Sequence, residues 1–149
     1  MTTTTFTMLA LLLLGSICSA TSLKNTTLNR DIDIQLFRIE NAVKTRNLPE
    51  FSMNFHEEFD SEAWFNRYYS QLTEAQLLTY TLRRFANVDP SPSSSSSSPS
   101  FTFKFSESRM NGPNMLHRSW VAKTKANPRN PYAIVELKQY GEYKKGLFE

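Results

Sequence analysis

The chain has a single cysteine, Cys18, which lies in its apolar N-terminal segment. Without a second thiol no intrachain disulfide can form, and beyond that segment neither a Cys-ligated zinc site nor a Cys nucleophile is available. The fold must therefore be held by its core. The sequence supplies 11 Phe, 6 Tyr and 2 Trp in 149 residues, so we expect one domain stabilised by aromatic packing.

The N-terminal segment has the outline of a secretory signal peptide. A Leu-rich run from Met8 to Leu14 is followed by small side chains that suit cleavage after Ala20. The run is too short to cross roughly 30 Å of hydrocarbon, so we expect no transmembrane span. A buried N-terminal helix is the alternative, because residues 1–7 carry no Lys or Arg. We expect a signal peptide at 1–20 and a secreted, extracellular protein without a nucleic-acid partner.

Charge is unevenly distributed along the chain. Residues 21–99 hold 8 basic and 10 acidic side chains, whereas residues 100–149 hold 9 basic and 4 acidic ones. The basic residues of the second part alternate with apolar ones, as on the solvated face of a sheet. A binding patch for an acidic polysaccharide or an anionic lipid is the alternative.

Helical periodicity dominates residues 29–72. After a polar segment, 21–28, which contains the glycosylation sequon at Asn25, a helix is expected to begin at Asn29 with Asn29 or Asp31 as its cap. A second, short helix is predicted by three phenylalanines at four-residue spacing, and a third runs from Asp60 or Ser61 to Leu72. The apolar stripes of the three helices are Ile32, Leu36, Ile39 and Val43; Phe51, Phe55 and Phe59; Trp64, Phe65, Tyr68 and Leu72.

Residues 73–88 fit two structures. Thr73 and Gln76 resemble a capping box, and Leu78, Leu82 and Phe85 fit a helix. Alternation favours a strand from about Leu77 instead. Its buried face would contain Leu78, Tyr80, Leu82, Ala86 and Val88.

The C-terminal half predicts strands. The Ser/Pro-rich stretch 89–100 is typical of a flexible loop insertion. Phe101, Phe103 and Phe105 alternate with polar residues and predict a strand. The turn at Asn111 and Gly112 pairs it with a strand over about 115–125. A last strand is expected from Tyr132 to Tyr140, so three helices precede four strands.

Several of these residues resemble small secreted nuclear transport factor 2-like domains of nematode type. The likeness lies in the segments 119–122 and 131–136 around an Asn-Pro turn, and in 46–48 with the three phenylalanines. It implies an α+β cone over 29–143, with N-terminal helices packed in a curved, mostly antiparallel sheet of about four strands and a tail at 144–149. The resemblance also implies a homodimer, because related folds often dimerise through the open face of the sheet.

The resemblance leaves function open, because this fold hosts both enzymes and non-catalytic binding domains. No catalytic, cofactor or metal residues are carried over. The first hypothesis is a binding domain whose cone accepts a small apolar or amphipathic ligand, or a protein partner, with four aromatic lining candidates. The second is an isomerase or dehydratase that uses His117 or a carboxylate such as Asp89 with a Tyr donor. The lining candidates are Trp64, Tyr68, Tyr80 and Trp120.

Overall fold

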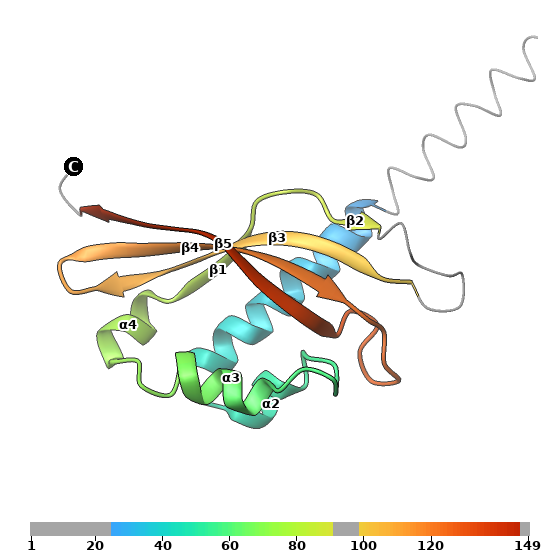
Figure 1. Cartoon of the computed structure of the whole chain (residues 1–149), viewed down its shortest axis with the longest axis horizontal. Coiled ribbons are helices and arrows are strands. Elements are labelled where there is room, and N and C mark those ends of the chain that lie inside the picture. Colours follow the sequence, from blue (N-terminus) through green and yellow to red (C-terminus); the bar gives the residue numbers. More distant parts are fainter. Residues whose placement is uncertain (1–24, 91–98, 147–149) are drawn as a thin grey trace, which may run out of the picture.

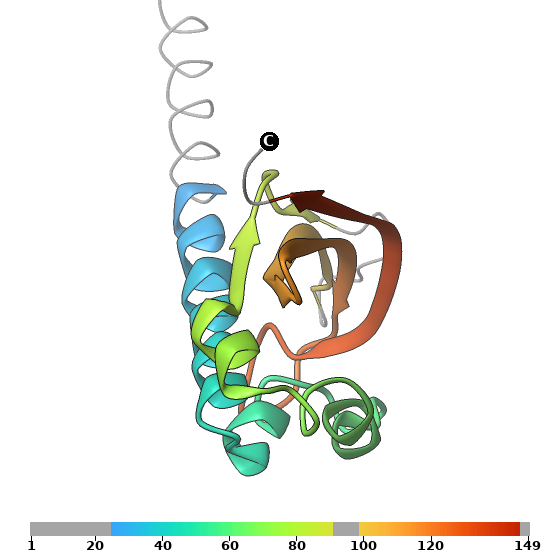
Figure 2. The same cartoon turned by 90° about the vertical axis from the view of Figure 1, so that its left-hand side faces the viewer.

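The computed structural model describes residues 25–90 and 99–146. All of its helices lie on one face of an antiparallel sheet that curves around them (Figures 1 and 2). The fold is therefore α+β, as predicted. The predicted signal peptide and most of the Ser/Pro-rich loop lie outside the described residues.

The first helix covers residues 25–44, and its predicted stripe forms the centre of the core. Ile32, Leu36, Ile39 and Val43 are each at most 4% exposed. The predicted start was wrong, because Asn29 lies inside the helix. Its side chain accepts a hydrogen bond from the backbone N–H of Val88 instead of capping its own helix.

Helix α2 is shorter than the phenylalanine spacing predicted. It spans Leu48–Ser52, with Asn47 as its N-cap and Pro49 in its first turn. Phe55 and Phe59 follow it in non-helical backbone. Their rings stack with centroids 4.7 Å apart, and the same distance separates Phe51 from Phe55. The four-residue spacing therefore reflects a row of closely packed rings that continues beyond the helix.

Helices α3 and α4 follow, each with the cap that the sequence indicated. Helix α3 spans Ser61–Tyr68, and the Asp60 carboxylate accepts the N–H of Ala63. Helix α4 spans Glu74–Thr79 and starts with a complete capping box formed by Thr73 and Gln76. The prediction that a strand begins at about Leu77 was therefore wrong for the residues up to Thr79, which are helical.

The sheet contains five strands in the order β1-β3-β4-β5, with β2 paired to β3. The hairpin around Gly112 is confirmed, and this glycine has the positive φ of 64° that the tight turn requires. The last strand is longer than predicted and includes the first residues of the expected tail. The strands are β1 (Thr81–Arg84), β2 (Asp89–Pro90), β3 (Phe101–Asn111), β4 (Asn114–Thr124) and β5 (Ile134–Gly146).

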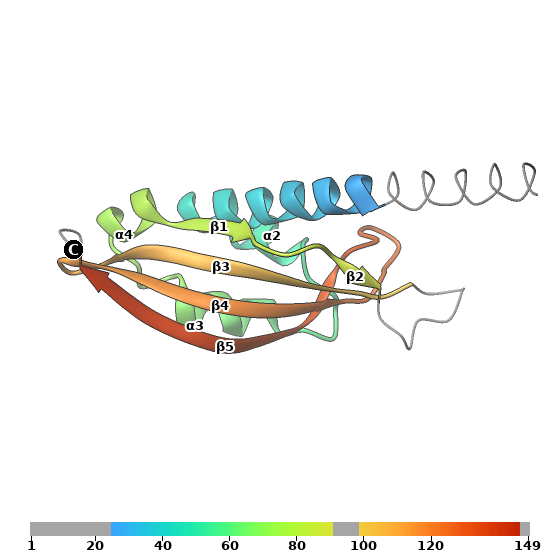
Figure 3. The ribbon, with the colours of Figure 1, turned by 90° about the horizontal axis from the view of Figure 1, so that it is seen from above.

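Side chains alternate between the two faces of the sheet. Phe103, Phe105, Glu107 and Arg109 of β3 are buried on the inner face, against the helices. Lys104, Ser106 and Ser108 of the same strand are on the outer face. Seen from above the sheet, no described helix covers that outer face over β3, β4 and β5 (Figure 3).

Candidate functional site

A carboxyl group is buried on the inner face of the sheet. Glu107 is 2% exposed. Its Oε2 accepts the indole N–H of Trp120 at 2.9 Å, and its Oε1 lies 3.7 Å from Nε of Arg109. Burial raises the pKa of Glu107, and this effect outweighs the opposing influence of Arg118, Trp120 and Arg109. The side chain therefore holds a proton to higher pH than an ordinary Glu.

Glu107 begins a row of alternating charge across three strands. It pairs in register with Arg118 of β4, which pairs with Glu142 of β5. Arg118 Nε donates to Glu142 Oε2 at 2.7 Å. Exposure rises along the row, from 2% for the side chain of Glu107 to 18% for Arg118 and 39% for Glu142. The row thus connects the buried carboxyl to solvent at the β5 side of the sheet.

Two tyrosines from the helical layer lie near this carboxyl. Tyr69 is 7% exposed and Tyr80 is fully buried, and their ring centroids are 5.7 Å apart. Burial and the neighbouring charge of Glu107 raise the pKa of Tyr69, and burial also raises the pKa of Tyr80. Both phenols therefore remain protonated at neutral pH and are hydrogen-bond donors.

Four polar atoms in this region lack a hydrogen-bond partner of acceptable geometry: Trp64 Nε1, Tyr80 Oη, Glu107 Oε1 and Arg109 Nε. Each of these atoms nevertheless has a polar neighbour: Tyr80 and Trp64 interact with the Tyr69 hydroxyl, and Glu107 Oε1 lies 3.7 Å from Arg109 Nε. Buried polar groups in folded proteins are nearly always paired, so such a concentration is unusual. We call these residues, together with Tyr69, Arg118 and Trp120, the interior polar cluster.

The structure places the four predicted lining residues in or beside this cluster. Trp64 lies 4.6 Å from Tyr68 and 5.6 Å from Trp120, measured between ring centroids. The ring of Tyr80 contacts that of Tyr69, which in turn contacts Tyr68. They pack against one another, and neither of the two hollows described below includes any of them.

Sequence reasoning missed the charged members of the cluster. A signal for Glu107 was present, because it continues the alternation of Phe101, Phe103 and Phe105 on the same strand face. Arg118 is likewise two residues from both Leu116 and Trp120 on β4, which places the three side chains on the same face of the sheet. Tyr69 carried no comparable signal, since it follows the last residue of α3.

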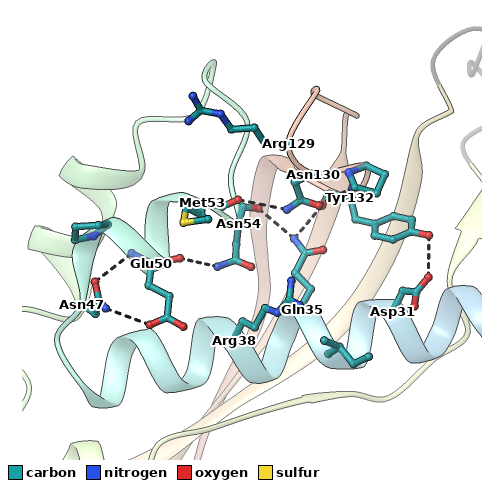
Figure 4. Close-up of a pocket in the computed structure, with 13 residues that line it drawn as sticks. Asp31, Gln35, Arg38, Asn47, Glu50, Met53, Asn54, Arg129, Asn130 and Tyr132 are labelled. Atoms are coloured by element: carbon teal, nitrogen blue, oxygen red, sulfur yellow. Dashed lines mark hydrogen bonds between the residues drawn. The ribbon is translucent and has the colours of Figure 1, made fainter.

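Two hollows lie elsewhere on the surface. The larger, of about 850 Å³, lies between the first helix, α2 and the loop before β5 (Figure 4). Gln35 Nε2 donates to the carbonyl oxygens of Asn54 and Tyr132 there, and the Tyr132 hydroxyl donates to Asp31. The second hollow, of about 690 Å³, includes Phe55, His56 and Phe59. The polar groups of the larger hollow mainly bond to one another and join separate parts of the chain.

The two groups named for catalysis from the sequence do not face the interior. His117 is on the outer face, where its ring stacks on Tyr143 and its Nδ1 lies 2.7 Å from Ser108 Oγ. Asp89 is exposed in β2. Asn25 is exposed within the first helix. In the described part of the chain, no three His, Cys, Asp or Glu side chains are grouped to hold a metal ion.

In comparisons with protein-family models, curated proteins and solved structures, the chain matches none. Within residues 25–90 and 99–146, no helix has the length and apolar character needed to cross a membrane.

Proposed function

We propose that this protein is an exported domain of the nuclear transport factor 2-like cone type that binds a small amphipathic molecule against the inner face of its sheet. The arrangement of helices on one face of a curved antiparallel sheet supports the cone assignment. The Leu-rich N-terminal segment supports export.

The observation that carries the binding proposal is the group of buried polar side chains around Glu107, four of whose atoms lack a hydrogen bond of good geometry. Leaving one buried donor or acceptor unsatisfied costs about 1 to 3 kcal/mol. A core that served packing alone would gain stability from apolar residues at these positions. A ligand that pairs with these groups would explain why a carboxyl, a guanidinium, a phenol and an indole are buried together.

The surroundings define the chemistry of the ligand. Arg109 and Arg118 would attract a carboxylate, sulfonate or other anionic head group, and the neutral Tyr80 hydroxyl would donate to it. Trp64 and Tyr68 are partly buried aromatic side chains that would contact an apolar body. The site therefore suits a molecule with an apolar ring or chain and one anionic or carbonyl end.

Fluorescence provides a direct test, because the only two tryptophans of the chain both lie at the cluster. The probe is 8-anilinonaphthalene-1-sulfonate, which combines aromatic rings with a sulfonate and accepts energy from tryptophan. We expect saturable energy transfer that is weakened about tenfold by Arg118→Gln, since one charged contact is worth roughly 1.5 to 3 kcal/mol. The control variant Arg30→Gln removes an exposed arginine from the first helix and should bind as the wild type does.

Equal binding by both variants, or transfer that never saturates, would contradict the proposed site. Circular dichroism and thermal unfolding of Arg118→Gln establish that a loss of binding is not a loss of fold. Export is tested separately by native mass spectrometry of protein from eukaryotic culture medium. A chain that begins at Thr21 and carries a retained small molecule would support both parts of the proposal, whereas retention in the cell would contradict export.

One observation favours a second candidate function, proton transfer at a carbon next to a carbonyl. Glu107 has a raised pKa and lies near two protonated tyrosines, which is the kind of environment a general base and its hydrogen-bond donors require. The Glu107 carboxylate would take a proton from the substrate and return it to another carbon of the same molecule. A β,γ-unsaturated ketone is a suitable probe, since conjugation changes its ultraviolet absorbance. Glu107→Gln should abolish the reaction, and Glu58→Gln should not.

A further inference from the structure

The outer face of the sheet carries more basic than acidic side chains. Alternation and register place four lysines on it: Lys104 of β3, Lys123 of β4, and Lys138 and Lys145 of β5. None of the four makes an ion pair with another described residue, whereas Lys44 and Lys125, which do make ion pairs, lie elsewhere. Glu136 is the one acidic side chain that the register places on this face of β3–β5 within the described residues. The face therefore carries a net positive charge that the protein does not neutralise.

The spacing of these lysines suits an extended partner. Lys104 and Lys138 are both register partners of Val121, so they are two strand spacings, or about 10 Å, apart. Lys138 and Lys145 lie on one strand and are separated by roughly 20 Å. One small anion cannot contact lysines spread over this distance, but a polymer with repeated charges can.

Exposed aromatic rings lie between the lysines. Phe85 follows β1 at one edge of the sheet and Tyr140 belongs to β5 at the other, yet their ring centroids are only 6.4 Å apart. The two side chains must therefore extend over the strands between them. They are 53% and 50% exposed, and Tyr143, which is 59% exposed, stacks on His117 nearby.

Below these rings the side chains are small and polar. Ser106, Ser119 and Gly141 are register neighbours on β3, β4 and β5. A Cβ atom added at Gly141 would lie 3.7 Å from the Ser119 Cβ. The side chains of this row are therefore short, and the neighbouring strands are in close contact. The Ser119 hydroxyl is therefore available beside the aromatic rings, and the Ser106 hydroxyl, which donates to the Arg83 carbonyl, can still accept a hydrogen bond.

We propose that this outer face is a binding surface for an acidic polysaccharide, one that carries sulfate or carboxylate groups along its chain. The lysines would contact the anionic groups, the rings would stack on the apolar faces of the sugars, and the serines would hydrogen-bond to hydroxyls. A membrane surface fits less well, because the exposed large apolar side chains of this face are all aromatic and none is aliphatic. This surface is on the opposite side of the sheet from the interior polar cluster and is independent of the function proposed for it.

The test uses the full chain as exported, with heparin oligosaccharide as the probe and neutral dextran as its uncharged counterpart, measured by calorimetry. Lys104→Gln combined with Lys138→Gln should weaken heparin binding about tenfold or more, and the remaining affinity should fall less steeply with salt. The matched control, Arg30→Gln combined with Arg38→Gln, removes the same charge from exposed positions of the first helix. That control should change the affinity by less than about twofold.

A second pair of variants distinguishes a glycan site from a simple basic patch. Tyr140→Ala combined with Tyr143→Ala keeps every lysine, so its effect reports ring contacts, and we expect a loss of about fivefold that persists at high salt. Three results would overturn the proposal: an equal loss in the arginine control, tighter binding to phosphatidylserine vesicles than to heparin, or a dimer that covers this face at the concentrations used. Sedimentation velocity and thermal unfolding of each variant settle the oligomeric state and the integrity of the fold.

Discussion

Glu107 shows how far a single residue can be understood from its neighbours in the chain. Strand alternation assigns it to the same face as Phe103 and Phe105. Whether a glutamate on that face is solvated or buried depends on what covers the strand. Tyr69, Tyr80 and Trp120 surround it here, and they leave it 2% exposed. Its ionisation is therefore coupled to folding.

This coupling predicts how stability depends on pH. The folded-state pKa of Glu107 lies above its ordinary value of 4.5, so the folded protein binds the proton more tightly than the unfolded chain does. Its contribution to the free energy of unfolding is present below pH 4.5 and is lost as pH rises through the raised pKa. Glu107→Gln does not titrate. Its stability relative to the wild type should therefore increase with pH in urea denaturation from about pH 4 to about pH 8.

Glu58→Gln is the control variant for the direction in which stability changes with pH. A hydrogen bond from Lys125 lowers the pKa of the Glu58 carboxyl, so this exposed group stabilises the protein above its ordinary pKa and the effect is lost on acidification. The stability difference for this variant should therefore have the opposite pH dependence, confined to the acid side. A Glu107→Gln difference that does not vary with pH would show that the carboxyl is not buried as described.

At the scale of elements, residues 73–88 show two local patterns in competition. The capping box at Thr73 and Gln76 predicted a helix, and the alternation of apolar residues after Leu77 predicted a strand. Both exist, in sequence: α4 ends at Thr79 and β1 begins at Thr81. Tyr80 is extended between them, with φ of −65° and ψ of 127°. The strand prediction failed at Leu78 because one turn of helix changes which residues share a face, leaving this side chain 80% exposed.

Helix α4 should depend on its cap. Thr73→Ala removes the side chain that accepts the N–H of Gln76, and we expect a loss of about 1 kcal/mol in the free energy of unfolding. Gln76→Ala should lose less when Thr73 is already replaced, because the two bonds form one reciprocal unit. Urea denaturation of both single variants and the double variant measures this. Leu78→Ala serves as the control and should change stability by less than about 0.5 kcal/mol; a larger loss would indicate that Leu78 is in the core.

At the scale of the whole molecule, polar side-chain contacts join segments that are far apart in the chain. Gln35 of the first helix donates to the carbonyls of Asn54 and Tyr132 (Figure 4). Residues 54–56 then continue along the start of β5 through backbone hydrogen bonds to Ile134. Arg46, at the end of the first helix, donates to the carbonyls of Ser70 and Leu72. Side chains of one helix thereby fix the positions of loops up to 97 residues away.

The Gln35 contacts should be important for stability. Gln35→Ala leaves the buried carbonyl of Asn54 and the partly buried carbonyl of Tyr132 without this donor, and we expect a loss of about 2 kcal/mol or more in the free energy of unfolding. Chemical denaturation compares it with Arg38→Ala, an exposed position on the same helix, which should be nearly neutral. Similar stabilities for the two variants would contradict the structural role assigned to Gln35.

The sequence by itself determined the features that depend on nearby residues. The core stripe of the first helix, the caps at Asp60 and Thr73 and the hairpin at Gly112 all follow from local periodicity, capping or turn geometry. The assignment to the nuclear transport factor 2-like family stays a prediction. Only the tertiary structure decided which charges are buried. The pairing of Glu107 with Arg118 and the burial of Tyr80 depend on contacts between distant segments, because desolvation arises from everything packed around a group and not from its neighbours in sequence.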